Sequence, residues 1–423
     1  MVNTNSYQLL EGRLADISFP HFRIYSTVVV KTICVIVTAI VLYVLITDQY
    51  GGAYRLHAIF AKRRLQQPIP VPKILVFTSF FRADLKKILL NVSCEVKCIY
   101  GSRAEMEEAE ADAVIFHVRD LEIMDNHTVV PWTRRPEQIY AALIFESPVN
   151  MGFVINGPHG PAPDFFNVTI DYRIDPLTYF WGYGMIAEAR TAEEKQQVHR
   201  MYDLEFEMLY RMKTRMALVM MSNCHAPSGR DYYLQALTEE IPVTRVGFCF
   251  PVANRTQCDR DYQSSTEVEC ERRMISEHFF YIAFENSVCE DYVTEKFWRL
   301  KRNIVPVVLK RSICRNLVPD SAFIAADDFD SPRELGLYLR TVADNPQLYR
   351  KFFEWRNTHY IKDHTRGLCE FCSDLHHGTV RLREKFNAHE YYSKNTCVEG
   401  YGSELLEPKR HWKVNRTFQL PHR

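Results

Sequence analysis

The sequence lacks an excess of charge of either sign, and it also lacks several short motifs that mark common enzyme classes. Its 423 residues hold 52 Lys+Arg against 52 Asp+Glu, and this formal net charge of +0 removes the basic footprint expected of a nucleic-acid-binding protein. G-x-G-x-x-G, G-x-x-x-x-G-K-[ST], H-E-x-x-H and G-x-S-x-G are all missing. Their absence argues against a dinucleotide-dependent enzyme, a P-loop enzyme, a zincin and an α/β-hydrolase.

One long apolar run is present near the N-terminus. Val28–Ile46 contains 19 residues with Lys31 as the only charge, which is long enough to cross a hydrocarbon layer as a helix. The run begins too far from the N-terminus, and is too long, for the apolar region of a cleaved signal peptide. We therefore expect an uncleaved signal anchor over residues 28–47, preceded by a cytoplasmic tail (1–27) and followed by a stem (48–72).

All N-glycosylation sequons of the chain follow this apolar run. They begin at Asn91, Asn126, Asn167, Asn254 and Asn415. Because this modification occurs on secreted or lumenal segments, the sequons predict that the bulk of the chain lies in the lumen or outside the cell. The same compartment is oxidising, so the 12 cysteines are expected to form disulfides there.

Beyond the stem, short apolar runs alternate with helical stretches, which is typical of βαβ units and parallel sheets. Two such blocks cover residues 73–214 and 215–372, and a charged helical connector ends the first. Residues 373–423 form a C-terminal extension with few apolar runs. The pattern predicts an α/β fold with two Rossmann-like domains that face each other across a cleft.

The candidates for chemistry are polar residues at the ends of buried runs, because ligands of parallel sheets bind at the carboxyl ends of strands. Glu146 ends one such run. A helix expected to start near Thr294 carries Lys296 in its first turn, where free N–H groups and a cation suit a diphosphate. Arg230, before another helix, offers a planar fork for phosphate oxygens. From these residues alone, solvated strand and helix ends remain the alternative interpretation.

Taken together, these motifs resemble the α-1,3-fucosyltransferases of the Golgi type. The most specific motif is FYIAFENSVCEDYVTEKFWR (Phe280–Arg299). Other motifs of the family recur in order along the chain: ADAVIFHVRD (111–120), RPEQIYAALIFESP (135–148), NVTIDYRIDP (167–176), SGRDYYLQAL (228–237), DDFDSPRELGLYL (327–339) and CEFC (369–372).

The resemblance implies a GT-B architecture, with the acceptor on the N-terminal domain and GDP-fucose on the C-terminal domain. It implies a single-pass type II protein of the Golgi membrane whose catalytic domain is lumenal. The implied reaction transfers L-fucose from GDP-β-L-fucose, with inversion and in α-1,3 linkage, to N-acetylglucosamine of the N-glycan core or of Lewis-type outer chains. No cofactor, metal ion or nucleic acid is required, and stimulation by a divalent cation is left open. The alternative function is an inactive lumenal protein that binds GDP-fucose or glycan.

The resemblance also assigns roles to individual residues. Glu146 matches the general base, and Glu285 is the next candidate for that role together with Glu295. The positions that match the donor site are Arg230, Asn286, Tyr292, Glu295 and Lys296, with Arg230 and Lys296 on the diphosphate.

The cysteines fit the resemblance as well. Cys94 and Cys98 match cysteines that pair with the C-terminal C-x-x-C, so we expect disulfides to Cys369 and Cys372. The rival interpretation of CEFC is a zinc site completed by two histidines, His376 and His377. Cys289, inside the Phe280–Arg299 motif, is left either paired or free.

Overall fold

The computed structural model describes residues 31, 33, 35–39, 70–121, 134–151, 161–162, 164–251, 265–362, 364–383, 387–393 and 397–407. The chain divides into two units, residues 1–70 and 71–423. Most of the expected anchor, the expected tail and nearly all of the stem lie outside the described residues. Within the described part of the chain, no helix is long and apolar enough to cross a membrane.

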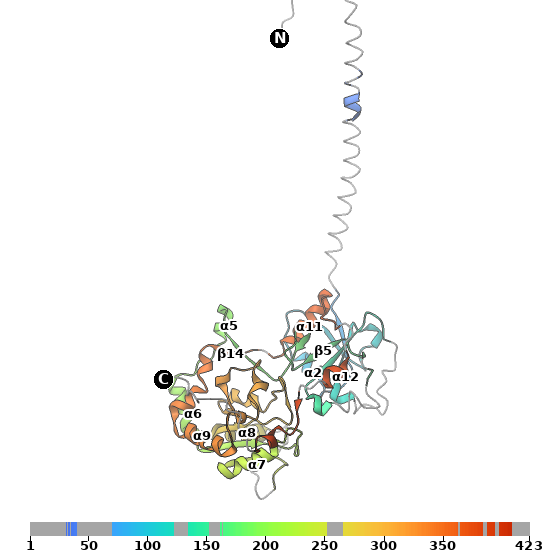
Figure 1. Ribbon diagram of the computed structural model, residues 1–423. Helices are drawn as coiled ribbons and strands as arrows, with labels where there is room; N and C mark the ends of the chain where they lie inside the picture. Colours follow the sequence, from blue (N-terminus) through green and yellow to red (C-terminus); the bar gives the residue numbers. More distant parts are fainter. Residues whose placement is uncertain are drawn as a thin grey trace, which may run out of the picture. The chain divides into compact units, whose positions relative to one another are not determined.

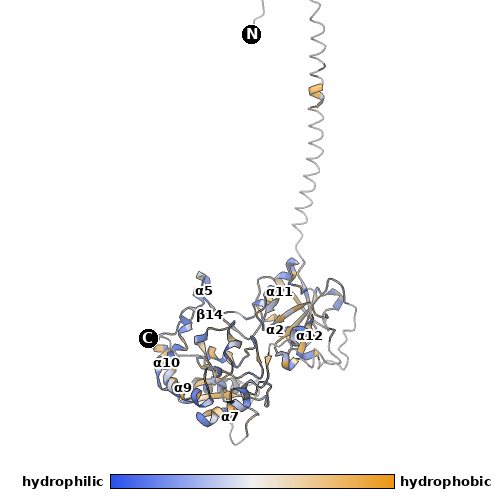
Figure 2. Cartoon of the chain, viewed as in Figure 1, coloured by the Kyte–Doolittle hydropathy of each residue, from blue (hydrophilic) through white to orange (hydrophobic). Residues whose placement is uncertain are grey.

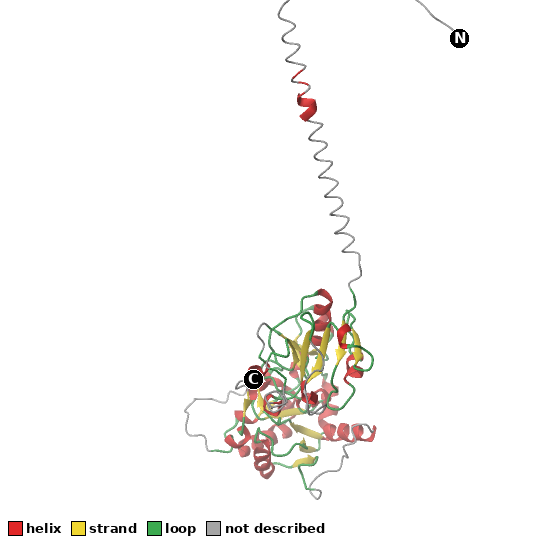
Figure 3. Cartoon of the chain, turned by 90° about the vertical axis from the view of Figure 1, so that its right-hand side faces the viewer, coloured by secondary structure: helices red, strands yellow, loops and turns green. Residues whose placement is uncertain are grey.

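The first half of the second unit is built on a six-stranded parallel sheet (Figure 3). Its strands are β1 (Lys73–Val76), β2 (Ile99–Ser102), β3 (Ala113–His117), β4 (Ile139–Ile144), β5 (Val168–Asp171) and β6 (Thr178–Phe180). They lie in the order β2-β1-β3-β4-β5-β6. The apolar strand β3 is buried along its whole length, as expected for a central strand of a parallel sheet that is covered on both faces.

Helices from both ends of the unit cover this sheet. Ile115 of β3 shares one apolar cluster with side chains of α2 (Leu85–Leu90) and α11 (Arg366–His377). The next side chain along the strand, Phe116, faces the opposite cluster, which includes residues of α12 (Ala388–Ser393). In Figure 1 the labels α2, β5, α11 and α12 accordingly lie together in one half of the unit.

The second half contains a five-stranded parallel sheet in the order β13-β12-β10-β8-β9. The strands are β8 (Arg215–Met220), β9 (Val243–Val246), β10 (His278–Ile282), β12 (Val305–Val308) and β13 (Ile324–Ala325). The strand order reverses between β8 and β10, so the topological switch point, where ligands of such sheets bind, lies after these two strands. The expected pair of Rossmann-like sheets is therefore present.

The helices of the second half pack around this sheet, and the apolar residues of both halves gather on the strands (Figure 2). The helices are α7 (Arg230–Glu240), α8 (Ser265–Glu277), α9 (Pro332–Asp344) and α10 (Pro346–Lys351). Short 3₁₀ helices of the unit are η1 (Glu108–Glu110), η2 (Val118–Asp120), η4 (Phe297–Arg302), η5 (Arg311–Cys314), η6 (Asp320–Ala322), η7 (Ala326–Asp328) and η8 (Glu354–Asn357).

The connector between the sheets differs from the expected single helical stretch. It consists of β7 (Met185–Glu188) and two separate helices, α5 (Ala192–Gln196) and α6 (Asp203–Met212). Strand β7 pairs antiparallel with β14 (His359–Lys362). Because this partner lies far away in sequence, the local pattern around residue 187 gave no signal of a strand.

The division expected at residue 372 also differs from the structure, because it cuts α11 in two. The described residues beyond 372 pack on both halves of the unit. Helix α12 packs on the first sheet, while β15 (Cys397–Val398) pairs antiparallel with β11 (Val288–Cys289) of the second half. The last described helix, α13 (Tyr401–Glu404), follows β15. The chain thus returns to both halves after the second sheet is complete.

Disulfides link C-terminal segments of the chain to both halves of the unit. Cys94 is bonded to Cys369 and Cys98 to Cys372, so the four cysteines singled out by the resemblance are joined to one another. A zinc site built on the C-x-x-C thiolates is therefore wrong. Cys289, which the sequence left either paired or free, is paired with Cys397. A further disulfide joins Cys224 to Cys249.

Candidate active site

The switch point of the second sheet is held together by Arg230, the first residue of α7. The side chain is 3% exposed, and its Nη1 and Nη2 donate to Phe284 O at 2.8 Å and Asn223 O at 2.6 Å. These two carbonyls follow β10 and β8, so one guanidinium spans the point where the strand order reverses. Burial lowers the pKa of Arg230, and the nearby carboxylate of Glu285 opposes that effect. We call residues 223–230 the Arg230 loop.

The segment after β10, residues 284–296, is called the donor loop below. The buried hydroxyl of Ser228 in the Arg230 loop donates to Glu285 O at 2.8 Å, and the Ser228 N–H donates to Asn286 O at 3.0 Å. The two loops are thereby fixed side by side. The Asn286 side chain is 8% exposed, and its Oδ1 has no hydrogen-bond partner among the described residues.

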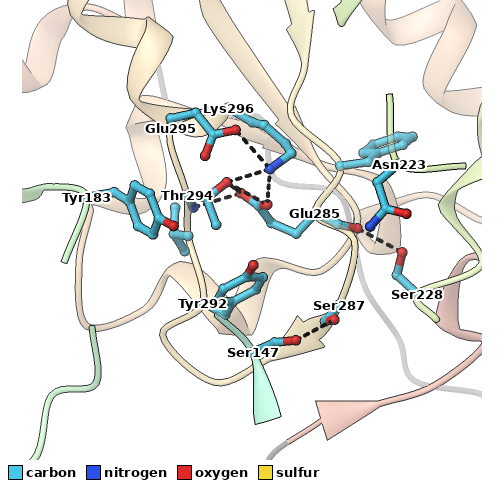
Figure 4. A network of polar contacts seen from close by, with 12 residues as sticks. Ser147, Tyr183, Asn223, Ser228, Glu285, Ser287, Tyr292, Thr294, Glu295 and Lys296 are labelled. Carbon is cyan, nitrogen blue, oxygen red and sulfur yellow. Dashed lines mark hydrogen bonds and ion pairs between the residues drawn. The ribbon is translucent and has the colours of Figure 1, made fainter. Parts of the chain in front are cut away.

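A buried carboxylate organises the far end of the donor loop (Figure 4). Glu285 is 3% exposed and accepts hydrogen bonds from Thr294 N at 2.8 Å and from Thr294 Oγ1 at 2.8 and 2.9 Å. The Lys296 ammonium lies 3.0 Å from Glu285 Oε2 and 3.2 Å from Glu295 Oε1. Burial raises the pKa of Glu285, and Lys296 opposes that effect. Glu285 is thus committed to three donors, which makes it a poor candidate for a proton acceptor.

The helix expected to begin at Thr294 is shorter and later than predicted. The structure has only the six-residue 3₁₀ helix η4, and Lys296 precedes it. The Thr294 hydroxyl donates to Glu285 and accepts a hydrogen bond from Lys296 Nζ, so it caps no backbone N–H. A helix dipole therefore adds little at this place, and positive charge comes from the side chains of Lys296 and Arg230.

Glu146 follows β4 of the first sheet, two residues beyond the strand end. Its half-buried carboxylate accepts hydrogen bonds at Oε2 from Asn150 Nδ2 at 3.0 Å and from the Tyr292 hydroxyl at 3.2 Å. Neither bond occupies Oε1. Tyr292 belongs to the donor loop and is 2% exposed, and burial raises its pKa well above the ordinary value, so the phenol stays a donor to Glu146.

Sequence reasoning missed several residues that hold this arrangement. Ser147 and Ser287, next to Glu146 and Asn286, join the two sheets through a buried hydroxyl pair at 2.7 Å. The Tyr183 hydroxyl donates to Phe145 O at 2.9 Å, beside the Glu146 backbone. Both serines lie within motifs that the sequence singled out, whereas nothing local distinguishes Tyr183.

The predicted site residues thus fall into one connected region. Glu146 meets Tyr292, and Lys296 meets Glu295 directly, while Arg230 reaches the strand end that leads into Asn286. Chemically the region offers a carboxylate whose hydrogen bonds with described residues all fall on one oxygen, Oε2, and two cations from the other sheet. In the described ranges of the chain, no group of three or more His, Cys, Asp or Glu is arranged to hold a metal ion.

Two of the five predicted glycosylation sites lie within the described residues. Asn91 is exposed at the end of α2, while Asn167 is half-buried and its Oδ1 accepts a hydrogen bond from Tyr140 N at 2.8 Å. Asn126, Asn254 and Asn415 lie outside the described residues.

Two family models match the chain over most of this architecture. Residues 70–184 match the model described as "Fucosyltransferase, N-terminal", and residues 210–389 match "Glycosyltransferase family 10 (fucosyltransferase) C-term". The two matches cover the first and second sheets respectively.

Similar curated proteins carry names of the same family. Alpha-(1,3)-fucosyltransferase fut-1 of Caenorhabditis elegans is 32% identical over 62% of this chain and 57% of its own length. Alpha-(1,3)-fucosyltransferase C of Drosophila melanogaster is 31% identical over 65% and 63%. Alpha-(1,3)-fucosyltransferase fut-6 of C. elegans is 30% identical over 73% and 76%. The chain thus spans less than two thirds of the first two relatives and about three quarters of the third. It belongs to the fucosyltransferases of glycosyltransferase family 10.

Proposed function

We propose that this protein transfers L-fucose from GDP-β-L-fucose, with inversion and in α-1,3 linkage, to N-acetylglucosamine of glycoprotein glycans. The observation that carries the proposal is the direct contact of Glu146 on the first sheet with Tyr292 in the donor loop of the second. Through it a proton acceptor lies beside a loop that carries Lys296 and whose first residue, Phe284, accepts a hydrogen bond from Arg230.

Glu146 acts as the general base in this proposal. Its carboxylate takes the proton from the acceptor hydroxyl while the hydroxyl oxygen forms a bond to the anomeric carbon of fucose. The bond from that carbon to the phosphate oxygen breaks on the opposite face, and GDP leaves with the bonding electrons. Glu146 suits the role because both of its hydrogen bonds are accepted by Oε2, which leaves Oε1 to the acceptor.

Lys296 and Arg230 stabilise the negative charge that grows on the leaving diphosphate. Their charges are partly balanced by Glu285, which lies 3.0 Å from the Lys296 ammonium and acts on the buried Arg230. Asn286, Tyr292 and Glu295 are assigned to the nucleoside diphosphate sugar. Because side chains supply the charge, the chemistry needs no cofactor, and stimulation by a divalent cation is tested by adding and chelating the ion.

The protein is further proposed to be a single-pass type II protein of the Golgi membrane, with its catalytic part in the lumen. The support is the apolar run Val28–Ile46, the position of all five sequons after it, and disulfides such as Cys94–Cys369, which persist in an oxidising compartment. Digestion with a glycosidase and a protease in sealed microsomes tests this topology.

The experiment that tests the function is GDP release from GDP-fucose by the purified full chain. Acceptors comprise N-glycans with an unmodified chitobiose core, outer chains that end in N-acetyllactosamine, and a reaction without acceptor. Turnover with one acceptor class, and an α-1,3 linkage in the product by NMR, support the proposal and identify the acceptor. Binding of GDP without turnover on any acceptor would favour the inactive protein that binds GDP-fucose, and no thermal shift with GDP would favour the inactive protein that binds glycan.

A further inference from the structure

The residues at the end of the described chain, 397–407, contact both loops of the candidate donor site. We call this segment the C-terminal clasp. It comprises β15, the turn at Gly400, α13 and the three residues that follow. In Figure 1 its dark red ribbon lies beside α7, the helix that begins at Arg230.

On one side the C-terminal clasp is hydrogen-bonded to the Arg230 loop. The Gly400 N–H donates to Pro227 O at 2.7 Å, and the Gly402 N–H donates to Ser228 O at 2.8 Å. Ser228 is fully buried, and its own N–H donates in the opposite direction, to Asn286 O at 3.0 Å. Ser228 is thus bonded through its backbone C=O to the C-terminal clasp and through its backbone N–H to the donor loop.

On the other side the C-terminal clasp is joined to the donor loop itself. Val398 pairs with Val288 in a two-stranded antiparallel ladder, and Cys397 forms a disulfide with Cys289. Three residues beyond Cys289, Tyr292 donates its hydroxyl to Glu146. One short segment therefore fixes the Arg230 loop and the centre of the donor loop at the same time.

Where the C-terminal clasp meets the Arg230 loop, the packing leaves no room for a side chain. A Cβ on Gly402 would collide with Gly229 O and would lie 2.7 Å from the Gly229 carbonyl carbon and 3.1 Å from Arg230 N. Gly229 itself has a φ of +66°, and a Cβ there would lie 2.8 Å from Ser403 Oγ. Backbone thus packs directly on backbone where the Arg230 helix begins. The Tyr401 hydroxyl adds an anchor, 3.1 Å from Asp327 Oδ2.

We propose that the C-terminal clasp is a positioning element for the nucleoside diphosphate sugar. It sets the spacing between Arg230 and the donor loop, although none of its own residues is assigned to the substrate. This inference rests on the proposed function, and it deepens it by naming the residues outside both sheets on which donor affinity depends. Displacement of the C-terminal clasp is expected to weaken donor binding while proton transfer to Glu146 continues.

The test compares Gly402→Ala with Gly336→Ala in the full chain. Gly336 is the control because its Cβ would lie 2.9 Å from Glu240 Cβ, a close but less severe contact with a side chain, between α9 and α7, that involves neither loop. We expect Gly402→Ala to raise the Kd for GDP and the KM for GDP-fucose at least tenfold. The KM for the acceptor and kcat stay within about threefold. Gly336→Ala changes none of these constants more than twofold.

A second variant covers the case in which Gly402→Ala does not fold. Replacement of both Cys289 and Cys397 by Ser removes the covalent tether but adds no bulk, and it is expected to raise the Kd for GDP by at least fivefold. Circular dichroism and the melting temperature establish that each variant is folded. A folded variant of either kind with wild-type affinity for GDP would overturn the role of the C-terminal clasp. A wild-type chain that binds no GDP would overturn the proposed function as well, so the two failures are distinguishable.

Discussion

The hydroxyl of Tyr292 lies 3.2 Å from Glu146 Oε2 and donates a hydrogen bond to it, although 146 positions separate the two residues. Tyr292 belongs to the donor loop of the second sheet, and Glu146 follows a strand of the first. The contact therefore couples the proposed proton acceptor to the loop proposed to hold the donor. Because the phenol is buried and remains protonated, it acts only as a donor to the carboxylate.

Removal of this hydroxyl is expected to impair turnover more than binding. A hydrogen bond to a charged group contributes about 1.5–3 kcal/mol, so Tyr292→Phe should lower kcat roughly tenfold to hundredfold. The Kd for GDP should stay within about threefold, because the variant keeps the ring of this donor-site residue and loses the hydroxyl that bonds Glu146. Steady-state GDP release and calorimetry measure the two effects. Tyr360→Phe is a matched control, because it removes a similar bond to Glu194 at 3.0 Å, away from the site. Equal kcat values for the two variants would contradict the role of Tyr292.

The pair of Lys296 and Glu285 is expected to show strong coupling in stability. Lys296→Met leaves the buried Glu285 carboxylate without its cation, and the free energy of unfolding should fall by about 3 kcal/mol. When Glu285→Gln is combined with Lys296→Met, part of this loss should be recovered, because the buried side chain that lost its cation is then neutral. Urea denaturation of the two single variants and the double variant measures the coupling. Additive losses would mean that the ion pair has no energetic role.

The two bridges between the loop at residues 94–98 and α11 are expected to support stability alone. Cys94–Cys369 and Cys98–Cys372 close sequence separations of 275 and 274. Loss of either bridge, by paired replacement with Ser, should cost about 2–5 kcal/mol of unfolding free energy. The Kd for GDP of the folded protein should not change, because these bridges join Cys94 and Cys98 to α11, which packs on the first sheet. A shift in Kd above threefold would show that they also shape the site.

Burial of Lys213 is expected to make the free energy of unfolding depend on pH. Lys213 is 6% exposed, its Nζ donates to Ile275 O at 3.0 Å, and burial lowers its pKa from 10.5 to about 7. Between these values the unfolded chain binds a proton that the folded chain does not, so stability rises with pH. Relative to Lys213→Met, the wild type should gain up to about 2 kcal/mol from pH 7 to pH 9. Urea denaturation at both pH values measures it, and a difference that does not change with pH would contradict the buried, neutral amine.

The sequence predicted the two parallel sheets because their strands are apolar runs bounded by polar residues. It also placed Glu146, Arg230 and Lys296 at strand and helix ends, and these residues fall in one region of the structure. Periodicity is a local property, so it gives the element type and the end at which ligands bind. The helix expected at Thr294 begins later, because the Thr294 hydroxyl is bonded to the side chains of Glu285 and Lys296 and caps no backbone N–H.

Several features that sequence reasoning missed are long-range. The pairing of β7 with β14 and the return of residues 397–407 to the donor loop depend on partners more than a hundred residues away. The Cys289–Cys397 bond is an example, since spacing alone does not specify which cysteines meet. Such contacts are decided by packing once the sheets are formed, so no local pattern announces them.

The proposed reaction depends most directly on Glu146 as the proton acceptor. The decisive measurement is kcat for GDP release from GDP-fucose by Glu146→Gln, with the best acceptor and with the Kd for GDP measured alongside. Glu205→Gln, which changes an exposed glutamate of α6, is the control. The account predicts that Glu146→Gln lowers kcat at least about a hundredfold while the Kd for GDP stays within threefold. A folded Glu146→Gln protein that turns over within tenfold of the wild type would contradict it.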